Sequence, residues 1–199
     1  MPPSDIKPEI KPKSYTRNLF IQVAKYTVIA FLIITPIRFF VAQPFIVSGG
    51  SMEPTFNSKE YLVIDEWSHR KTAPERGDVI VFRYPLDPSV YFVKRVIGLP
   101  GETVVIQDGV VGIQSPGGHE SRIISEPYLS NEYSKKDSST TKLGWDEYFV
   151  LGDNRSGSAD SRTWGPLQKR FIVGQPLVRL FPLQKIEFFP GAHHFSDAQ

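Results

Sequence analysis

A long apolar segment near the N-terminus, Leu19–Ile37, is the first constraint on how this chain can fold. Gln22 and Lys25 are its conspicuous polar residues, and Arg38 follows it. Because a membrane-spanning helix needs about 20 mainly apolar residues, the segment is long enough to cross a bilayer. The Lys25 ammonium would then extend toward the nearer headgroups. We therefore predict one transmembrane helix over residues 19–41.

Two other interpretations of this segment are a buried helix of a soluble protein and a cleavable signal peptide. A signal peptide normally ends in small residues at its cleavage site, and Val41-Ala42-Gln43 fits that pattern poorly. Length favours the permanent anchor. Cations precede the segment and none lies between Arg38 and Lys59, so the positive-inside rule predicts a cytoplasmic N-terminus. Residues 1–18, rich in Pro, Lys and Ser, are expected to form a disordered cytoplasmic tail.

The rest of the chain favours a mainly β fold, because Phe, Tyr and Pro are plentiful and suit strands and turns. Apolar patterns predict strands at 61–65, 78–83, 90–97, 103–107, 148–151, 171–174 and 177–180. A turn at 98–101 predicts that the strands on either side of it pair as a hairpin. Residues 108–144 have few apolar runs and are expected to form a small inserted β subdomain. We therefore expect an antiparallel β-sheet domain over 42–190, outside the cytoplasm, and a patternless tail over 191–199.

Composition and spacing argue against several kinds of function. A net charge of +2 does not support a nucleic-acid partner. The chain has no cysteine, which excludes disulfides, a thiolate nucleophile and a cysteine-ligated metal. The carboxylates are scattered and no histidine pair has ligand spacing, so we expect no metal site. The polar segment Gly152–Arg162 lacks the lysine-serine ending of a phosphate-binding loop.

The loop Ser48–Thr55, with the sequence SGGSMEPT, lies between the apolar segment and the first predicted strand. Glycine permits tight turns, so Ser51 is a candidate nucleophile, although glycine-flanked serines are also common in ordinary turns. The G-x-S-x-G elbow is absent, because Glu53 stands in place of its second glycine. A serine needs a base. The four histidines lie in polar or terminal segments and are expected to be exposed loop residues: His69, His119, His193 and His194.

Lys94 is the strongest candidate for the base. A free lysine has a pKa of about 10.4, so a catalytic lysine must be desolvated to lose its proton near neutral pH. In the strand predicted at 90–97, Lys94 shares a face with the apolar Phe92 and Val96. Arg95 lies in the same strand, but a guanidinium cannot act as a base. The alternative is an ordinary strand lysine that extends to solvent.

These segments resemble the bacterial type I signal peptidases, which are membrane-anchored Ser/Lys endopeptidases. The resemblance rests, in the family's order, on Ser51–Thr55, Arg76–Phe82, Lys94–Glu102 and Gly152–Arg162, and also on Glu126–Leu129 in the insert. It implies that Ser51 is the nucleophile and Lys94 the general base. It also implies that Ser158 orients the lysine and that Asp160 and Arg162 support the site. In that segment Asp160 and Arg162 can pair, or the turn can simply satisfy its own polar groups.

The resemblance leaves the oxyanion donors open. Some members carry a serine two positions before the nucleophile, where this chain has Gly49. Similarity to the glycine-bearing members implies two backbone N–H donors, from Ser51 and Gly49. The hydroxyl of Ser48 remains an alternative. Removing one such donor can cost about 3–4 kcal/mol of barrier stabilisation.

The implied activity is removal of signal peptides from exported preproteins at the outer face of a lipid membrane. That membrane is the cell membrane or an internal bacterial membrane such as the thylakoid. Small residues are expected at the first and third positions before the scissile bond, with shallow apolar pockets beside Ser51. No metal or organic cofactor is implied, and we expect a monomer.

Two rival functions remain at this stage. A self-cleaving Ser/Lys protease of the repressor type would carry a DNA-binding domain, whereas residues 1–50 show an apolar segment and no helix-turn-helix. A non-enzymatic membrane-anchored β domain that binds a partner would need neither Ser51 nor Lys94.

Overall fold

A computed structural model describes residues 13–40, 42–67, 72–118, 120–193 and 195 of the chain. The chain divides into two compact units, residues 1–40 and 41–199, which are treated separately below. Most of the predicted N-terminal tail, residues 1–12, lies outside the described residues. So do residues 194 and 196–199 of the predicted C-terminal tail.

The first unit is the helix α1 (Lys13–Phe40), which has 28 residues. Its segment Arg17–Thr35 is long and apolar enough to span a membrane. The side chains described along this segment are exposed up to residue 34, as expected for a helix whose apolar surface faces lipid. The prediction of a disordered tail is wrong for residues 13–18, because the helix begins at Lys13. Pro12 is the last helix-breaking residue before that point.

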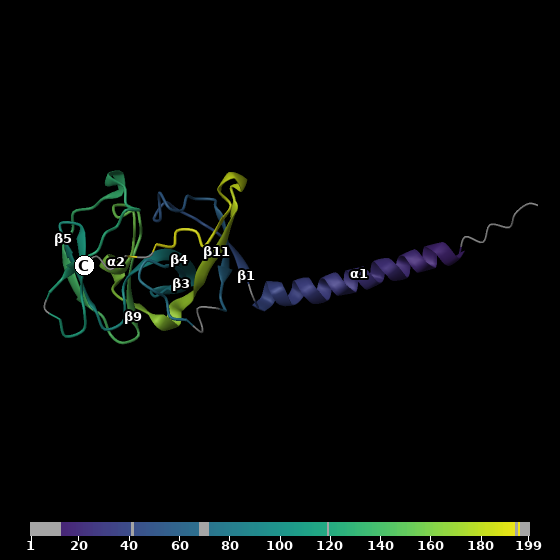
Figure 1. The fold of residues 1–199 in the computed structure, drawn as a ribbon, viewed down its shortest axis with the longest axis horizontal. Helices are drawn as coiled ribbons and strands as arrows, with labels where there is room; N and C mark the ends of the chain where they lie inside the picture. Colours follow the sequence, from purple (N-terminus) through teal and green to yellow (C-terminus); the bar gives the residue numbers. More distant parts are fainter. Residues whose placement is uncertain (1–12, 41, 68–71, 119, 194, 196–199) are drawn as a thin grey trace, which may run out of the picture. The chain divides into compact units, whose positions relative to one another are not determined.

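The second unit is built on an eight-stranded antiparallel sheet (Figure 1). Its strands, in spatial order, are β1 (Ala42–Ile46), β2 (Tyr61–Asp65), β11 (Ile172–Phe181), β3 (Val79–Tyr84), β4 (Asp87–Gly98), β9 (Glu147–Leu151) and β10 (Leu167–Gln168), with β12 (Glu187–Phe188) paired to β11. The predicted mainly β, antiparallel fold class is confirmed.

A smaller four-stranded sheet lies at the opposite end of this unit from β1 (Figure 1). Its order is β7 (Arg122–Ile123), β6 (Val110–Gln114), β5 (Thr103–Gln107) and β8 (Ser139–Lys142). This sheet is the predicted inserted subdomain, but it begins at β5 rather than at residue 108.

The predicted hairpin between residues 90–97 and 103–107 is therefore wrong. β5 pairs with β6 and β8, whereas β4 pairs with β3 and β9. The chain crosses between the two sheets at Gly98. A Cβ on Gly98 would collide with Val104, Leu143 and Phe149, so the close approach of the sheets requires glycine here.

β11 is one continuous strand, although the sequence predicted two strands at 171–174 and 177–180. Its pairing with β2 shifts register between Pro176 and Val178 and again between Arg179 and Phe181. Pro176 thus interrupts the ladder locally without ending the strand, as is typical of a bulge.

Short helices complete the unit: α2 (Ser161–Trp164), η2 (Asn131–Tyr133), η3 (Lys169–Phe171) and η4 (Leu183–Lys185). One core cluster takes three side chains from the loop that follows β1, since Val47, Met52 and Phe56 are buried in one cluster with residues of β2 and β3. Apolar burial of this kind stabilises by about 25 cal/mol per Å² and fixes the loop to the main sheet. The loop that carries Ser51 is therefore part of the core rather than a free surface turn.

Candidate active site

Ser51 and Lys94 meet in the structure although they are far apart in the sequence. The Lys94 Nζ lies 2.7 Å from Ser51 Oγ and 3.0 Å from the carbonyl oxygen of Val93, and it donates to both. Lys94 is only 3% exposed, and its Nζ lies 5.1 Å from the centroid of the Phe92 ring. The predicted shared face of Phe92 and Lys94 is confirmed, and the strand brings the lysine to the serine.

Burial changes the acidity of this lysine. Desolvation lowers the pKa of Lys94 from 10.5 to about 8, and the negative charges of Asp160 and Asp153 partly oppose that shift. An amine with this pKa is neutral in a substantial fraction of molecules just above neutral pH. The Ser51–Lys94 pair thus has the contact and the proton affinity that base catalysis requires.

The same shift predicts a stability effect of replacing Lys94 by methionine. The folded-state pKa lies below the unfolded value, so the buried charge destabilises the native protein below pH 8. This cost falls as the pH rises from 8 toward 10.5 and vanishes above 10.5, where the lysine is neutral in both states. The full shift corresponds to about 3 kcal/mol. We expect Lys94→Met to raise the free energy of unfolding at pH 7 by up to this amount.

Urea unfolding of the full chain in detergent at several pH values measures the effect. The difference in free energy of unfolding between the methionine variant and the wild type should shrink steadily from pH 8 to pH 10.5. If Lys94→Met is less stable than the wild type at pH 7, the buried ammonium does not destabilise the native protein.

Asn154 holds the two backbone carbonyl groups on either side of the Ser51 Cα. Its backbone N–H donates to the carbonyl of Ser51 at 3.1 Å, and its side-chain amide donates to the carbonyl of Gly50 at 3.0 Å. Sequence reasoning missed this residue, although it lies in the polar segment Gly152–Arg162. The turn itself is closed by two further bonds, from Glu53 N–H to Gly50 and from Phe56 N–H to Met52.

The candidate oxyanion donors lie at the start of this turn. Gly49 has φ 89°, in the left-handed region that favours glycine. Neither its N–H nor that of Ser51 donates to another residue within the described part of the chain. Both groups are thus available to an incoming oxygen. The side chain of Ser48 is exposed, and the identity of the second donor stays a prediction.

Asp160 and Arg162 form the pair that the sequence suggested. Asp160 is fully buried, accepts from Arg162 Nε and Nη2 at 2.8 Å each, and accepts from the Gly152 N–H at 3.1 Å. Burial by itself would raise the pKa of Asp160, but the hydrogen bonds and charge of Arg162 outweigh it and lower that pKa. The carboxylate stays ionised and contributes negative potential at Lys94.

Ser158 does not make the contact that the resemblance implied. Its hydroxyl is buried without a hydrogen bond of good geometry to any described residue, Lys94 included. The Ser158 side chain occupies the space that a Cβ on Gly152 would need. It is oriented toward Asp160 and helps to lower the pKa of that carboxyl group. Its role in orienting the lysine stays a prediction.

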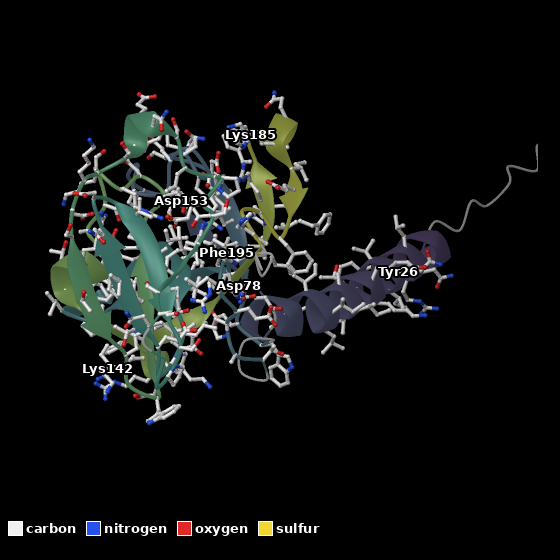
Figure 2. The ribbon with its side chains drawn as sticks, turned by 60° about the vertical axis from the view of Figure 1, so that its left-hand side comes forward. Tyr26, Asp78, Lys142, Asp153, Lys185 and Phe195 are labelled. Carbon is white, nitrogen blue, oxygen red and sulfur yellow. The ribbon has the colours of Figure 1, made fainter. Side chains whose placement is uncertain are left out.

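A buried ion pair lies directly behind the site, and sequence reasoning assigned it no role. Arg95 and Asp153 are each 1% exposed, and they form two hydrogen bonds of 2.9 and 2.6 Å. Thr55 Oγ1 donates to the same carboxylate at 2.5 Å, which ties the nucleophile loop to β4. Figure 2 shows Asp153 in the interior of the second unit. Arg95 lies within the segment Lys94–Glu102 and Asp153 within Gly152–Arg162, which is the clue that the sequence offered.

An apolar cavity of about 330 Å³ lies beside Ser51 and Lys94. Its walls come from β1, the loop that follows it and β4, and include Phe45, Val47 and Val93. The rings of Phe45 and Tyr91 meet edge to face at 5.3 Å. The cavity matches in position the shallow apolar pockets that were expected beside the nucleophile.

The histidines contribute nothing to this cavity in the part of the chain that is described. His69, His119 and His194 lie outside the described residues. His193 is half-buried, and its ring packs against Tyr128 at 5.3 Å and Phe195 at 4.9 Å. The expectation of an exposed loop residue is wrong for His193, because the C-terminal segment folds back onto the domain. Within the described ranges, no group of three or more histidines and carboxylates is placed to bind a metal.

Residues 20–181 match the family model described as signal peptidase, peptidase S26. A probable signal peptidase I-2 of Synechocystis sp. is 34% identical over 182 residues, covering 88% of this chain and 80% of that protein. The signal peptidase I of Leptolyngbya laminosa is 37% identical over 158 residues, covering 75% of this chain and 74% of that protein. A crystal structure of a signal peptidase I from Enterococcus faecalis superimposes with a TM-score of 0.44 at 31% identity, covering 52% of this chain and 97% of that one.

Proposed function

Because this chain belongs to the signal peptidase family, peptidase S26, and is a serine peptidase, we propose that it removes N-terminal signal peptides from exported preproteins with Ser51 as nucleophile and Lys94 as general base. One observation carries the proposal: a lysine 3% exposed, with a pKa lowered to about 8, lies 2.7 Å from a serine hydroxyl. An ordinary strand lysine would extend to solvent and keep its usual pKa.

In the first half of the reaction, neutral Lys94 takes the proton of Ser51 as Oγ attacks the scissile carbonyl carbon. The carbonyl oxygen becomes an oxyanion that accepts from the N–H groups of Ser51 and Gly49. The Lys94 ammonium then donates its proton to the leaving amine, and the C–N bond breaks. An acyl-enzyme ester on Ser51 and a free mature N-terminus result.

In the second half, Lys94 is neutral again and takes a proton from water that attacks the ester carbonyl. Collapse of this intermediate breaks the bond to Oγ, and the Lys94 ammonium returns a proton to Ser51. Asp160, paired with Arg162, keeps negative charge near the ammonium that forms in each half. The charge opposes the effect of burial, so it sets the lysine pKa near the working pH rather than far below it.

The sequence context supports a membrane topology for this reaction. Helix α1 anchors the chain in a membrane, and the distribution of cations around it favours a cytoplasmic N-terminus. The second unit, which holds Ser51 and Lys94, then lies on the outer side, where exported preproteins emerge. Either the cell membrane or an internal bacterial membrane such as the thylakoid fits this arrangement.

The test is cleavage of a synthetic signal peptide, with alanine at the first and third positions before the scissile bond, by the full chain in detergent. We expect one cut at that bond, located by mass spectrometry. Below pH 8, kcat/KM should rise about tenfold per pH unit and then level off, because only neutral Lys94 can accept a proton. The pH profile separates this mechanism from one with a base of lower pKa.

A matched substrate with tryptophan at the first position before the scissile bond is the control. The resemblance to the family implies a small residue at this position, so this peptide should remain uncut. A rate independent of pH between 6 and 9 would contradict the role of Lys94, and failure to cut the alanine peptide at any pH would contradict the proposed function.

A further inference from the structure

Arg179 is a buried arginine that the proposed reaction does not use. It lies in β11, is 6% exposed, and is followed by the exposed apolar residues Leu180 and Phe181. Its guanidinium carbon lies 4.9 Å from the centroid of the Phe56 ring, and its Nη2 donates to the carbonyl oxygen of Thr55 at 2.8 Å. Both contacts are with the C-terminal side of the loop that carries Ser51.

The same loop supplies the charge that balances this arginine. Glu60, 2% exposed, lies with Oε2 3.2 Å from Arg179 Nε in an ion pair whose angles are not those of a hydrogen bond. The other oxygen of Glu60 accepts from the amide of Asn57 at 3.3 Å. Two exposed groups from the hairpin of β11 and β12, whose connection holds η4, complete the charge cluster: Lys185, 3.8 Å from Glu60, and Glu187, 3.6 Å from Arg179. Figure 2 shows Lys185 at the tip of this hairpin.

The nucleophile loop is thus fastened at both ends. Asn154 holds its first part through the carbonyls of Gly50 and Ser51. Arg179 and Asp153 hold its second part through the carbonyl and the hydroxyl of Thr55. The bond from Phe56 N–H to Met52 makes the intervening turn stiff, so a shift of Thr55 is passed to Ser51.

The strand that carries Arg179 is well suited to hold the loop in place. At Arg179, β11 pairs with β2 on one side and with the two-residue strand β12 on the other, so the strand has a paired neighbour on both sides at this point. A planar guanidinium can lie on a ring, pair with a carboxylate and donate to a carbonyl at the same time, which a lysine ammonium cannot do. The contact with Thr55 therefore connects Ser51 to a rigid element other than the one that carries Lys94.

We propose that Arg179 is a positioning residue that sets the distance from Ser51 Oγ to Lys94 Nζ by holding the Thr55 carbonyl. The proposal rests on the proposed function, because it assigns a role in that reaction. A misplacement of about 1 Å at a reacting group can cost about 10²-fold in rate. Loss of the Thr55 contact should thus lower kcat far more than it changes KM, because the apolar walls that β1 and β4 give to the cavity stay in place.

The test must separate positioning from stability, since Arg179→Met alone leaves the buried Glu60 carboxylate with only the exposed Lys185, 3.8 Å away, as a counter-charge. The double variant Arg179→Met/Glu60→Gln removes both charges and retains the hydrogen-bond partner of Asn57. We expect it to unfold in urea close to the wild-type midpoint but to lose about 10- to 100-fold in kcat on the alanine signal peptide. Its kcat/KM profile should also move to higher pH, because water that enters beside a displaced Ser51 hydrates Lys94.

Arg179→Lys is the companion variant. It keeps a cation beside Glu60 and should fold, yet it should show the same fall in kcat. Arg170→Met, at an exposed position in η3, is the matched control and should leave kcat, KM and the pH profile unchanged. Wild-type kcat and an unmoved pH profile in the double variant would overturn the proposal. If the wild-type chain cuts no signal peptide, the proposed function fails. If the wild type and the Arg179 variants cut it equally well, only the positioning role fails.

Discussion

Replacement of Lys94 by arginine is expected to abolish cleavage of the alanine signal peptide, with a loss of about four to six orders of magnitude in kcat. Arginine keeps the positive charge and most of the length of the side chain, but it cannot release its proton at any pH that a protein tolerates. Since the reaction requires a neutral amine 2.7 Å from Ser51 Oγ, the variant has no base. Raising the pH to 10 should not restore the rate.

Two measurements make this result specific. Circular dichroism and the urea midpoint report whether Lys94→Arg still folds, because the site is buried and a guanidinium is larger than an ammonium. Lys142→Arg makes the same chemical change at an exposed position of the small sheet, labelled in Figure 2, and should keep wild-type activity. A folded Lys94→Arg protein with activity above a hundredth of the wild-type value would show that another group takes the serine proton.

Ser51→Ala should cause the second large loss. Without the hydroxyl no ester can form, and removal of a serine nucleophile in other hydrolases lowers kcat by about 10⁶-fold. The fold should persist, since the Ser51 contacts that fasten the loop are made by its carbonyl and by the backbone around it. We expect the variant to bind the signal peptide with near wild-type affinity, because the walls of the cavity are unchanged.

Fluorescence anisotropy with a labelled peptide measures the binding, and mass spectrometry after a single turnover measures the acyl-enzyme. Wild-type protein mixed rapidly with peptide should show a mass increase equal to the acyl fragment, and Ser51→Ala should show none. Ser58→Ala, at an exposed position in the same loop, is the control and should retain full activity. An acyl adduct on the Ser51→Ala protein would identify a different nucleophile.

Local sequence patterns were sufficient for several parts of this protein. An apolar segment of spanning length predicts a helix, because a long run without breakers and with few charges has no other stable form in lipid. Alternation of apolar residues predicts the strands and places Phe92 and Lys94 on one face. The same alternation singles out Lys94 as a lysine with apolar neighbours, and burial then lowers its pKa.

The partners of those strands depend on the tertiary structure. Alternation determines which face of a strand is buried but not which neighbour it pairs with, so the assignment of Thr103–Gln107 to a hairpin with β4 is wrong. The continuity of β11 was also not predictable from local pattern. Pro176 would end the strand unless a bulge in the pairing with β2 accommodates it, and that bulge depends on the neighbouring strand. The half-buried position of His193 also follows only from where the C-terminal segment packs.

For the site, the sequence by itself determined which residue types can do the chemistry: a serine in a glycine-rich loop, a lysine on an apolar strand face, and a polar segment that can brace them. Only the tertiary structure decided how the loop is held, through Asn154, the Arg95–Asp153 pair and Arg179. These contacts join residues from 58 to 124 positions apart, as with Arg95 and Asp153 or Thr55 and Arg179. Hydrogen bonds over such separations follow from the order of strands in the sheet, which no local periodicity encodes.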